Sequence, residues 1–317
     1  MKLAVIILNY NDRPHTEKLA RKVAGFSLVS LVVIVDNQST DGSGEELADY
    51  FRHAGKVAVI RTSRNGGYGY GNNAGLRYAC GQGCTHMLIA NPDTDFTEDM
   101  LQKLCEVFVK KRDAGVVSAM MLDSQHGLQQ TAWPLRSFTQ DLINAGPLAR
   151  RLLGWSINYP KSKFRSGVDL QKNPGDQENQ AVNRNQIIHP VRVGVVHGSL
   201  LMISREAFEK TGGYDEKVFL YSEENILARR LQMAGFATYV VPEALYHHEN
   251  SGTISKTYHS MVLKQKLRQE SEMYYYEEYL HIGLVRKLIA KLCQSIVMFE
   301  TKALDKMLEM KAKLMKS

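Results

Sequence analysis

The chain has 317 residues, of which 44% are apolar and 23% are charged, as in a soluble globular protein with a sizeable core. This length predicts one large domain with an appendage, or two domains. Residues 281–317 contain eight Lys or Arg against three Asp or Glu, whereas the rest of the chain is almost neutral. A nucleic-acid-binding body would need a clustered basic surface, so we expect no nucleic-acid partner.

Cysteine usage and the absence of long apolar runs bound the setting of the protein. The four cysteines are too few for a disulfide scaffold and lack the second pair or nearby histidine of a zinc site, so we expect free thiols in a reducing cytosol. No cleavable leader follows Lys2, and no apolar run has the length that spans a bilayer. We expect a cytoplasmic protein, with a basic tail that can bring it to the inner face of the plasma membrane.

The first 121 residues alternate between short apolar runs and amphipathic segments. The segments, such as 14–26 and 97–115, have helical spacing and polar faces. The runs are rich in Val and Ile and cover residues 3–8, 28–35, 57–61, 86–90 and 114–121. Strands that alternate with helices in this way predict βαβ units on a mostly parallel sheet.

Polar residues follow four of these predicted strands at their carboxyl ends. They are Asn9-Tyr10-Asn11, Asp36-Asn37, Arg64-Asn65-Gly66-Gly67 and Asp93-Thr94-Asp95. In open parallel sheets ligands bind outside the carboxyl ends of the strands. We therefore expect the four groups to form one site.

Residues 122–255 are expected to form a second portion of the same domain. The segment near 155–190 has no repeating apolar face and is typical of a long, mobile loop. Order returns with a strand that runs into Ser204 and a helix that closes at Gly212-Gly213. A second helix ends at Gly235, and a further strand over 237–241 precedes Pro242.

Residues 256–317 predict an amphipathic, basic helical tail. Its apolar residues follow one another at spacings of three or four, with lysines beside them. They are Leu284, Leu288, Leu292, Ile296, Phe299, Ala303, Met307, Met310 and Leu314. Three interpretations fit this stripe: packing on the core, contact with a partner or a second copy, and docking on an anionic membrane surface.

Two pairs of carboxylates carry candidate chemistry. Asp93 and Asp95 stand two residues apart after an apolar run, and an extended chain would present both on one side, where they need a cation. Asn-Pro-Asp is also common turn chemistry, which is the simpler interpretation. Glu223 and Glu224 open a predicted helix, whose dipole tolerates anions, and a cap with solvated charge is the simpler interpretation there.

Two further segments are individually weak signals. His247 and His248 follow a strand, where a histidine near carboxylates can bind a metal although most such residues are structural. Residues 64–75 are rich in glycine and enter a helix, so their backbone amides can approach an anion. Their spacing does not match a dinucleotide-binding fingerprint.

The order of the motifs is more specific than any one of them. Seven motifs follow one another between residues 1 and 255: N-Y-N, V-D-N-Q-S-T-D-G-S, N-G-G-Y-G-Y-G-N-N-A-G, N-P-D-T-D, H-G-S-L-L-M-I-S-R, G-G-Y-D-E-K-V-F-L-Y-S-E-E and H-E-N-S-G-T. This series resembles glycosyltransferase family 2, and within it the rhamnosyltransferase-like, non-processive members. The resemblance implies a GT-A fold, which is a Rossmann-like α/β domain with a mostly parallel sheet flanked by helices. Within a domain of residues 1–255, residues 1–121 would bind the nucleotide and residues 122–255 would lie on the acceptor side, with 256–317 as a C-terminal helical extension.

The resemblance also implies an activity. It is an inverting, metal-dependent transfer of a sugar from a nucleoside diphosphate, either dTDP-rhamnose or a UDP-sugar, to a hydroxyl group. The acceptor would be a glycan or a lipid-linked glycan in bacterial surface polysaccharide synthesis. Mn²⁺ or Mg²⁺ would neutralise the diphosphate leaving group.

Site residues carry over by position. Glu224 matches the general base, and Asp93-Thr94-Asp95 matches the DxD motif. The metal would be held by Asp95 and Asp93 with His248, and His247 is the fallback. The nucleotide-sugar would be bound by Asn9, Tyr10, Asn11, Asp36, Asn37, Asn65, Asn73 (expected at the start of a helix), Asp93 and Asp95.

Departures from the family pattern keep other interpretations open. Glu224 replaces the usual Asp, Ile226 stands where many members carry another acid, and Arg229 stands where an aromatic residue is frequent. One alternative is a non-catalytic, nucleotide-sugar-binding scaffold subunit of a glycosyltransferase complex. A nucleotidyltransferase would instead need a glycine- and lysine-rich loop near the N-terminus, and residues 8–18 contain no glycine.

Overall fold

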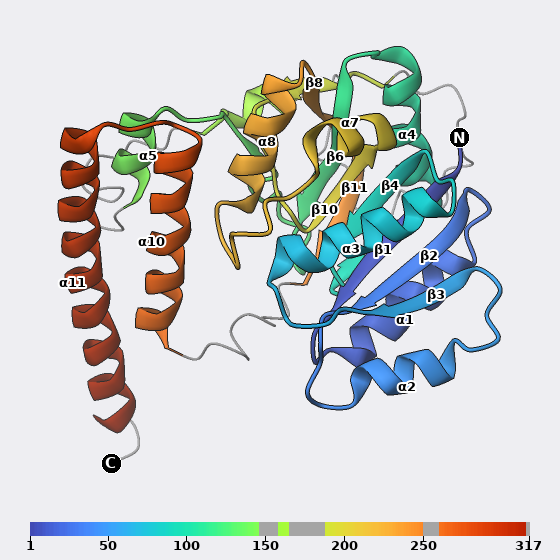
Figure 1. The fold of residues 1–317 in the computed structure, drawn as a ribbon, viewed down its shortest axis with the longest axis horizontal. Coiled ribbons are helices and arrows are strands. Elements are labelled where there is room, and N and C mark those ends of the chain that lie inside the picture. Colours follow the sequence, from blue (N-terminus) through green and yellow to red (C-terminus); the bar gives the residue numbers. More distant parts are fainter. Residues whose placement is uncertain (146–157, 165–187, 250–259, 315–317) are drawn as a thin grey trace.

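A nine-stranded mixed sheet lies at the centre of the protein (Figure 1). The computed structural model describes residues 1–145, 158–164, 188–249 and 260–314, so most of the loop predicted near 155–190 lies outside the described residues. The strands run in the order β3-β2-β1-β4-β10-β6-β11-β5, and β8 pairs with β11. Their bounds are β1 Leu3–Asn9, β2 Val29–Asp36, β3 Val57–Arg61, β4 His86–Ala90, β5 Thr94–Asp95, β6 Ala114–Leu122, β8 Val191–Val193, β10 Leu200–Ser204 and β11 Ala237–His248.

The first four strands confirm the predicted parallel sheet. β1 pairs in parallel with β2 and with β4, and β2 pairs in parallel with β3. Their carboxyl ends therefore lie at the same edge, where the predicted polar groups follow them. The register between β1 and β2 ends at the pair Asn9 and Asp36, which brings two of these groups directly together.

The second half of the sheet departs from simple βαβ alternation. β10 lies between β4 and β6 and is antiparallel to both, whereas β11 is parallel to β6. β11 continues well past the predicted end at residue 241, because a register shift between Val241 and Leu245 absorbs Pro242. This extension carries His247 and His248 beside β5. A small separate sheet pairs β7 (Ala132–Trp133) with β9 (Val195–Val196).

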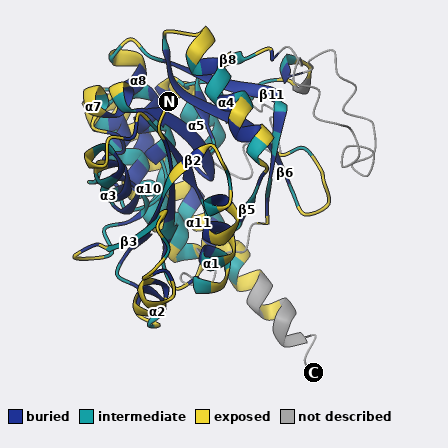
Figure 2. Cartoon of the chain, turned by 90° about the vertical axis from the view of Figure 1, so that its right-hand side faces the viewer, coloured by how far each residue is buried: buried dark blue, intermediate teal, exposed yellow. Residues whose placement is uncertain are grey.

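Helices cover both faces of the sheet and make two apolar cores. Alternate residues of β1 face opposite sides: Leu3, Val5 and Ile7 enter one core, and Ala4 and Ile6 enter the other. The first core is covered by α1 (Arg13–Ala24), α2 (Ser43–Tyr50) and α4 (Glu98–Lys110). The second core is covered by α3 (Tyr68–Gly81), α7 (Arg205–Thr211) and α8 (Glu223–Met233). Figure 2 shows the strands as the buried centre.

The C-terminal tail folds as a helical hairpin beside the domain. α10 (Met261–Glu278) and α11 (Leu284–Leu314) pack on each other and on α5 (Phe138–Ala145). A short 3₁₀ helix, Lys161–Phe164, is separate from this hairpin. A third apolar cluster joins Tyr275 and Tyr276 of α10 to Ile226 of α8. The cluster thus crosses the predicted boundary between residues 255 and 256. In the described residues no helix is long and apolar enough to cross a membrane.

Candidate active site

A buried contact between a histidine and an aspartate lies at the carboxyl edge of the sheet. Nε2 of His248, at the end of β11, is 3.3 Å from Oδ1 of Asp93, which follows β4. Both side chains are almost inaccessible, at 8% and 10% exposure. Nδ1 of His248 is buried and has no hydrogen-bond partner among the described residues. Such a group costs stability, which marks it as a candidate for binding a ligand.

Asp93 and Asp95 lie in different backbone conformations. Asp93 lies in a turn, where the N–H of Thr94 donates to the carbonyl of Asn91 at 3.1 Å, and only Thr94 and Asp95 are in strand β5. The alternation of an extended chain therefore does not extend to Asp93. Asp95 is half exposed and forms an ion pair with Lys22 of α1.

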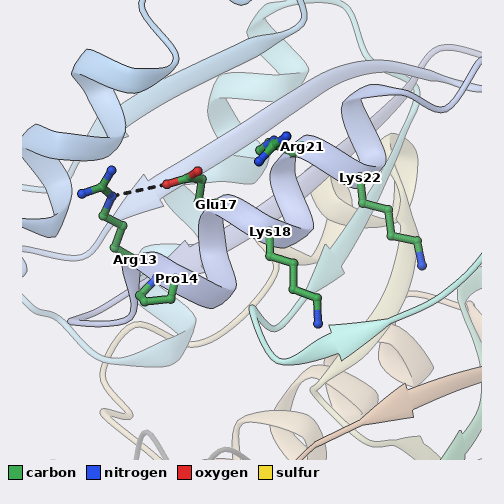
Figure 3. Close-up of a pocket in the computed structure, with 6 residues that line it drawn as sticks. All are labelled: Arg13, Pro14, Glu17, Lys18, Arg21 and Lys22. Atoms are coloured by element: carbon green, nitrogen blue, oxygen red, sulfur yellow. Dashed lines mark ion pairs between the residues drawn. The ribbon is translucent and has the colours of Figure 1, made fainter.

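Figure 3 shows the face of α1 that supplies Lys22. The hollow drawn there is lined by Arg13, Pro14, Glu17, Lys18, Arg21 and Lys22, all from this one helix. Arg13 pairs with Glu17 at 3.4 Å, and the Lys18 and Lys22 side chains point to the same side. The helix thus gives Asp95 a cationic neighbour of its own, separate from the pair between Asp93 and His248.

The donor set at Asp93 and His248 fits part of a metal site. The contact brings one carboxylate oxygen and one imidazole nitrogen to within 3.3 Å of each other. One carboxylate and one imidazole suit Mn²⁺ or Mg²⁺. In the part of the chain that the structure describes, no three His, Cys, Asp or Glu side chains gather closely enough to hold a metal. The predicted three-ligand set of Asp93, Asp95 and His248 is therefore not assembled.

A pair of glutamates opens α8. Glu223 is buried, with Oε2 lacking a partner among the described residues, and Glu224 accepts a hydrogen bond from the N–H of Gly198 at 3.3 Å. Burial raises the pKa of both carboxyl groups, that of Glu223 to well above its usual range, and the neighbouring Glu224 adds to the rise at Glu223. A carboxylate with a raised pKa is a stronger base, so Glu224 is suited to take a proton.

The turn before α8 has an uncommon backbone that the C-terminal hairpin supports. Tyr221 and Ser222 both have positive φ, at 71° and 62°, a region that costs non-glycine residues of order 1 kcal/mol each. Ser271 of α10 donates to the carbonyl of Leu220 at 2.7 Å, and Arg268 lies 4.9 Å from the centre of the Tyr221 ring. α10 thereby fixes the segment that leads into the glutamates.

Asp215 ties the same hairpin to the loop further upstream. Its carboxylate accepts hydrogen bonds from the hydroxyls of Tyr274 at 2.8 Å and Tyr279 at 2.6 Å, and pairs with Arg230 at 3.0 Å. Ile226, the departure noted in the sequence, is fully buried in the cluster with α10. An apolar residue fits there because the hairpin covers that face of α8.

Hydrogen bonds through Gly198 and Tyr68 connect Glu224 to Asn91, two residues before Asp93. The Tyr68 hydroxyl lies 2.6 Å from the carbonyl of Gly198 and 3.1 Å from Oδ1 of Asn91. Burial and the nearby Glu224 raise the pKa of Tyr68 well above its usual range, so it stays protonated. Gly198 approaches Glu224 so closely that a Cβ would lie 3.0 Å from Oε1. The repeated Gly-Tyr of the glycine-rich segment was the only signal for Tyr68.

The aromatic rings of His197, His248 and Trp133 lie near one another. The His197 ring is 5.7 Å from the His248 ring and 6.5 Å from the Trp133 ring. Nδ1 of His197 accepts from the N–H of Ser199 at 3.1 Å, and burial lowers the pKa of His197 to about 4, so the ring is neutral at pH 7. Trp133 donates to Asn225, next to Glu224, at 2.9 Å. The H-G-S motif pointed to this region without assigning the histidine.

The residues predicted to bind the nucleotide differ in how far they are buried and in how many hydrogen bonds they form within the protein. Asn9 is fully buried, and its side chain bonds to Asp36, Ser39, Ser43 and Thr16 at 3.0–3.1 Å. Asn9 therefore holds the loops around it together, and its contact with the nucleobase stays a prediction. Tyr10 is half-buried and Asn11 is exposed, and their nucleotide contacts stay predictions.

Asp36 and Asn37 are buried and bonded within the protein. The carboxylate of Asp36 is only 1% exposed and pairs with Arg61 at 3.2 Å. Asn37 donates to Oδ1 of Asn65 at 3.0 Å and to the carbonyl of Gly67 at 3.1 Å, so it shapes the glycine-rich loop. Nucleotide contacts of Asp36, Asn37 and Asn65 stay predictions.

Asn73 is a structural link. It lies in the second turn of α3 and not at the start of a helix as predicted, because α3 begins at Tyr68. Asn73 is 1% exposed, donates to the carbonyl of Tyr214 at 2.9 Å and accepts from its N–H at 3.0 Å. Gly67, with φ of 90°, packs so tightly that a Cβ would meet the carbonyl oxygen of Phe219 at 2.1 Å. Together they join the glycine-rich loop to the segment before the glutamates.

Comparison with solved structures defines the fold. A mannosyltransferase from Pyrobaculum calidifontis, solved with GDP-mannose and Mn²⁺, has a TM-score of 0.54 and 16% identity over 95% of this chain and 73% of that chain. The structure of GalNAc-T7 with UDP, GalNAc and Mn²⁺ has a TM-score of 0.56 and 16% identity over 78% of this chain, which spans 44% of that protein. At this identity the likeness shows the fold, which is the predicted GT-A fold.

Sequence relatives define the family. The family model for glycosyl transferase family 2 matches residues 4–212, more than half of the chain. The chain is 26% identical over 266 residues to the N-acetylglucosaminyl-diphospho-decaprenol L-rhamnosyltransferase of Mycobacterium tuberculosis, covering 79% of this chain and 77% of that protein. It is 24% identical over 217 residues to the dTDP-rhamnosyl transferase RfbF of Shigella flexneri, covering 68% and 59%. The chain belongs to glycosyltransferase family 2, and it is a glycosyltransferase.

Proposed function

We propose that the protein is an inverting glycosyltransferase that moves a sugar from a nucleoside diphosphate to a hydroxyl of a glycan or lipid-linked glycan in surface polysaccharide synthesis. dTDP-rhamnose is the favoured donor because two relatives are named as rhamnosyltransferases, and a UDP-sugar is the alternative. The observation that carries the proposal is the buried pair of Asp93 and His248, linked through the 197–199 segment to Glu224.

Asp93 and His248 are the residues that would hold Mn²⁺ or Mg²⁺, and the ion would supply positive charge to the diphosphate leaving group. A site with few protein ligands is usual for Mg²⁺, which is completed by substrate phosphates and water. Asp95 would then not contact the ion directly, because it already pairs with Lys22. The Tyr68 hydroxyl, 3.1 Å from Oδ1 of Asn91, would help to hold the turn that carries Asp93.

Glu224 takes the proton of the acceptor hydroxyl as the oxygen attacks the anomeric carbon. The carbon–oxygen bond to the diphosphate breaks on the opposite side, so a single displacement inverts the configuration. The extra methylene of Glu224 relative to Asp is accommodated where Gly198 leaves room for the carboxylate. Neutral His197 and Trp133 line the acceptor side without adding charge.

The test is a transfer assay with dTDP-rhamnose and an N-acetylglucosaminyl-diphospho-polyprenol acceptor, repeated with UDP-hexoses. The expected product has the anomeric configuration opposite to that of the donor, as read by NMR. Turnover that survives in Glu224→Gln would contradict the assigned base.

The second candidate is a non-catalytic, nucleotide-sugar-binding scaffold subunit. It is favoured by the replacement of Asp by Glu at position 224 and by the two-ligand metal site among the described residues. Donor binding without turnover for any acceptor, unchanged in Glu224→Gln, would establish it.

A further inference from the structure

The outer face of α11 is an unpartnered apolar surface. We define it by Leu284, Leu288, Leu292, Ile296, Phe299 and Met307, which are each 52–75% exposed. Exposed single apolar residues are ordinary, but a continuous row of large ones along a single helix marks an interaction surface.

The opposite side of the same helix is already packed. Ala290, Val297 and Thr301 are buried, at 0%, 6% and 7% exposure. Gln269 of α10 and Gln294 of α11 donate to each other's backbone carbonyls at 2.7 and 3.0 Å, which fixes the pairing of the two helices. The outer face is therefore not the face that packs on α10, and α11 itself lies at the edge of the described structure (Figure 1).

The charge beside the outer face is positive. Lys302 and Lys306 follow Phe299 by three and seven residues, which places them along the same side of the helix, and both are exposed. Residues 281–317 hold eight Lys or Arg and three Asp or Glu. A face made of large apolar side chains with a cationic border matches the interface of an anionic lipid bilayer.

We propose that α11 docks the protein on an anionic membrane surface, with the helix lying in the plane of the headgroups. The outer face would enter the boundary between headgroups and acyl chains, and the lysines would contact lipid phosphates. A helix of 31 residues at 1.5 Å per residue gives about 46 Å of contact length. A second copy of the chain would cover the same apolar side chains, but it offers few acids to pair with the lysine border.

Docking in this way would set the orientation of the active site. α10 connects the docked helix to the segment before Glu223 and Glu224 through Ser271 and through the tyrosines on Asp215. A membrane-embedded acceptor would then meet the site at a fixed height. This last step rests on the proposed function, whereas the docking itself rests only on α11.

The test is co-sedimentation of the full chain with vesicles of phosphatidylcholine alone and with phosphatidylglycerol added. We expect binding only to the anionic vesicles, and binding at least about tenfold weaker for the double variant Leu292→Gln/Phe299→Gln. The matched control is Val109→Gln/Met233→Gln, which removes equally exposed apolar residues from α4 and α8 and should bind as the wild type does.

A second pair of variants tests the charge. Lys302→Glu/Lys306→Glu should weaken binding about tenfold or more, since each lysine near an anionic surface contributes about 1 kcal/mol, or about fivefold. Lys111→Glu/Arg112→Glu, an exposed cationic pair after α4, should have no effect. Raising the salt concentration should weaken wild-type binding.

Three outcomes would overturn the proposal: no binding of the wild type to anionic vesicles, equal binding by Leu292→Gln/Phe299→Gln, or a wild-type dimer that this variant dissociates while vesicle binding is absent. The last would assign the outer face to a second copy. Transfer to a soluble acceptor analogue should be unchanged in the α11 variants, so failure of docking and failure of the transferase assignment are separable.

Discussion

The polar residues at the carboxyl edge of the sheet fall into two groups that differ in how their hydrogen-bonding atoms are used. On the side predicted to bind the nucleotide, Asn9 and Asn73 have every side-chain polar atom engaged by the protein itself. On the side proposed to be catalytic, Nδ1 of His248 and Oε2 of Glu223 are buried without a partner in the described residues. A saturated group stabilises loops, whereas an unsaturated group costs stability and remains available to a ligand or a proton.

The largest expected effect separates the two glutamates. Glu224→Gln should lower kcat by about 10²- to 10⁴-fold, because a positioned base contributes that much. Glu223→Gln is the matched control and should change kcat only a few-fold, because the raised pKa of Glu223 makes the neutral amide a close mimic of its protonated form. Steady-state kinetics on both variants check this, and equal losses would remove the distinction.

His248→Ala should lower metal-stimulated activity by about 10²-fold, since metal ions contribute several kcal/mol of charge stabilisation. The change should appear as a loss of the response to added Mn²⁺ in a titration of initial rates. His247→Ala, on the neighbouring residue of β11, should retain the response. If His247→Ala is the variant that loses it, the fallback ligand is the correct one.

Asn9→Ala should lower the free energy of unfolding by about 2–4 kcal/mol, because it leaves Ser39, Ser43 and Thr16 without their shared partner. Urea unfolding measures this. Asn158→Ala, which removes an amide near the surface, should change the free energy of unfolding by less than about 1 kcal/mol. Weaker nucleotide binding at unchanged stability would instead mean that Asn9 contacts the ligand.

Acid should destabilise the protein in part through His197. Its pKa is about 4 in the folded protein against about 6.5 in an unfolded chain, so the unfolded state binds the extra proton first. Stability is therefore lost as the pH falls from about 6.5 toward 4, by about 1–3 kcal/mol from this residue. A flatter pH dependence of unfolding in His197→Gln would confirm it, and an unchanged slope would contradict it.

The smallest expected effect is a gain in stability from Glu223→Gln. Because the folded state raises the pKa of Glu223, the wild type loses stability as the pH rises above about 4.3 through the folded pKa. The amide removes this cost, so the melting temperature should rise by about 2–4 °C at pH 7 and not at pH 4. Thermal unfolding at both values measures the difference.

The sequence predicted the bounds of several strands well. β4 and β6 lie inside the sheet, and the runs at 86–90 and 114–121 predicted them to within one residue; β3, which is only half-buried at the sheet edge, also begins and ends at the predicted residues. The extent of β11 could not be predicted, because Pro242 is normally a strand breaker and only the register shift beside β6 allows the strand to continue.

The sequence predicted at which edge of the sheet the candidate site residues lie, but not which side chains they contact. That Asp93 and Glu224 belong to one edge followed from the motif order, but the partner of Asp95 depends on the position of α1, which no local pattern encodes. The hydrogen bonds of Asn9 likewise come from Ser39, Ser43 and Thr16, which meet only after the chain has folded. Tertiary contacts decide which polar residues stay free for a ligand.

The most direct measurement is the thermal stabilisation of Asp93→Asn and Asp95→Asn by dTDP-rhamnose and UDP-sugars, with and without Mn²⁺. Ligands that bind the folded state raise the melting temperature with the ratio of their concentration to Kd. We expect a metal-dependent shift in the wild type and in Asp95→Asn that is lost in Asp93→Asn. A shift lost in Asp95→Asn and kept in Asp93→Asn would contradict the assignment of the metal to Asp93 and His248.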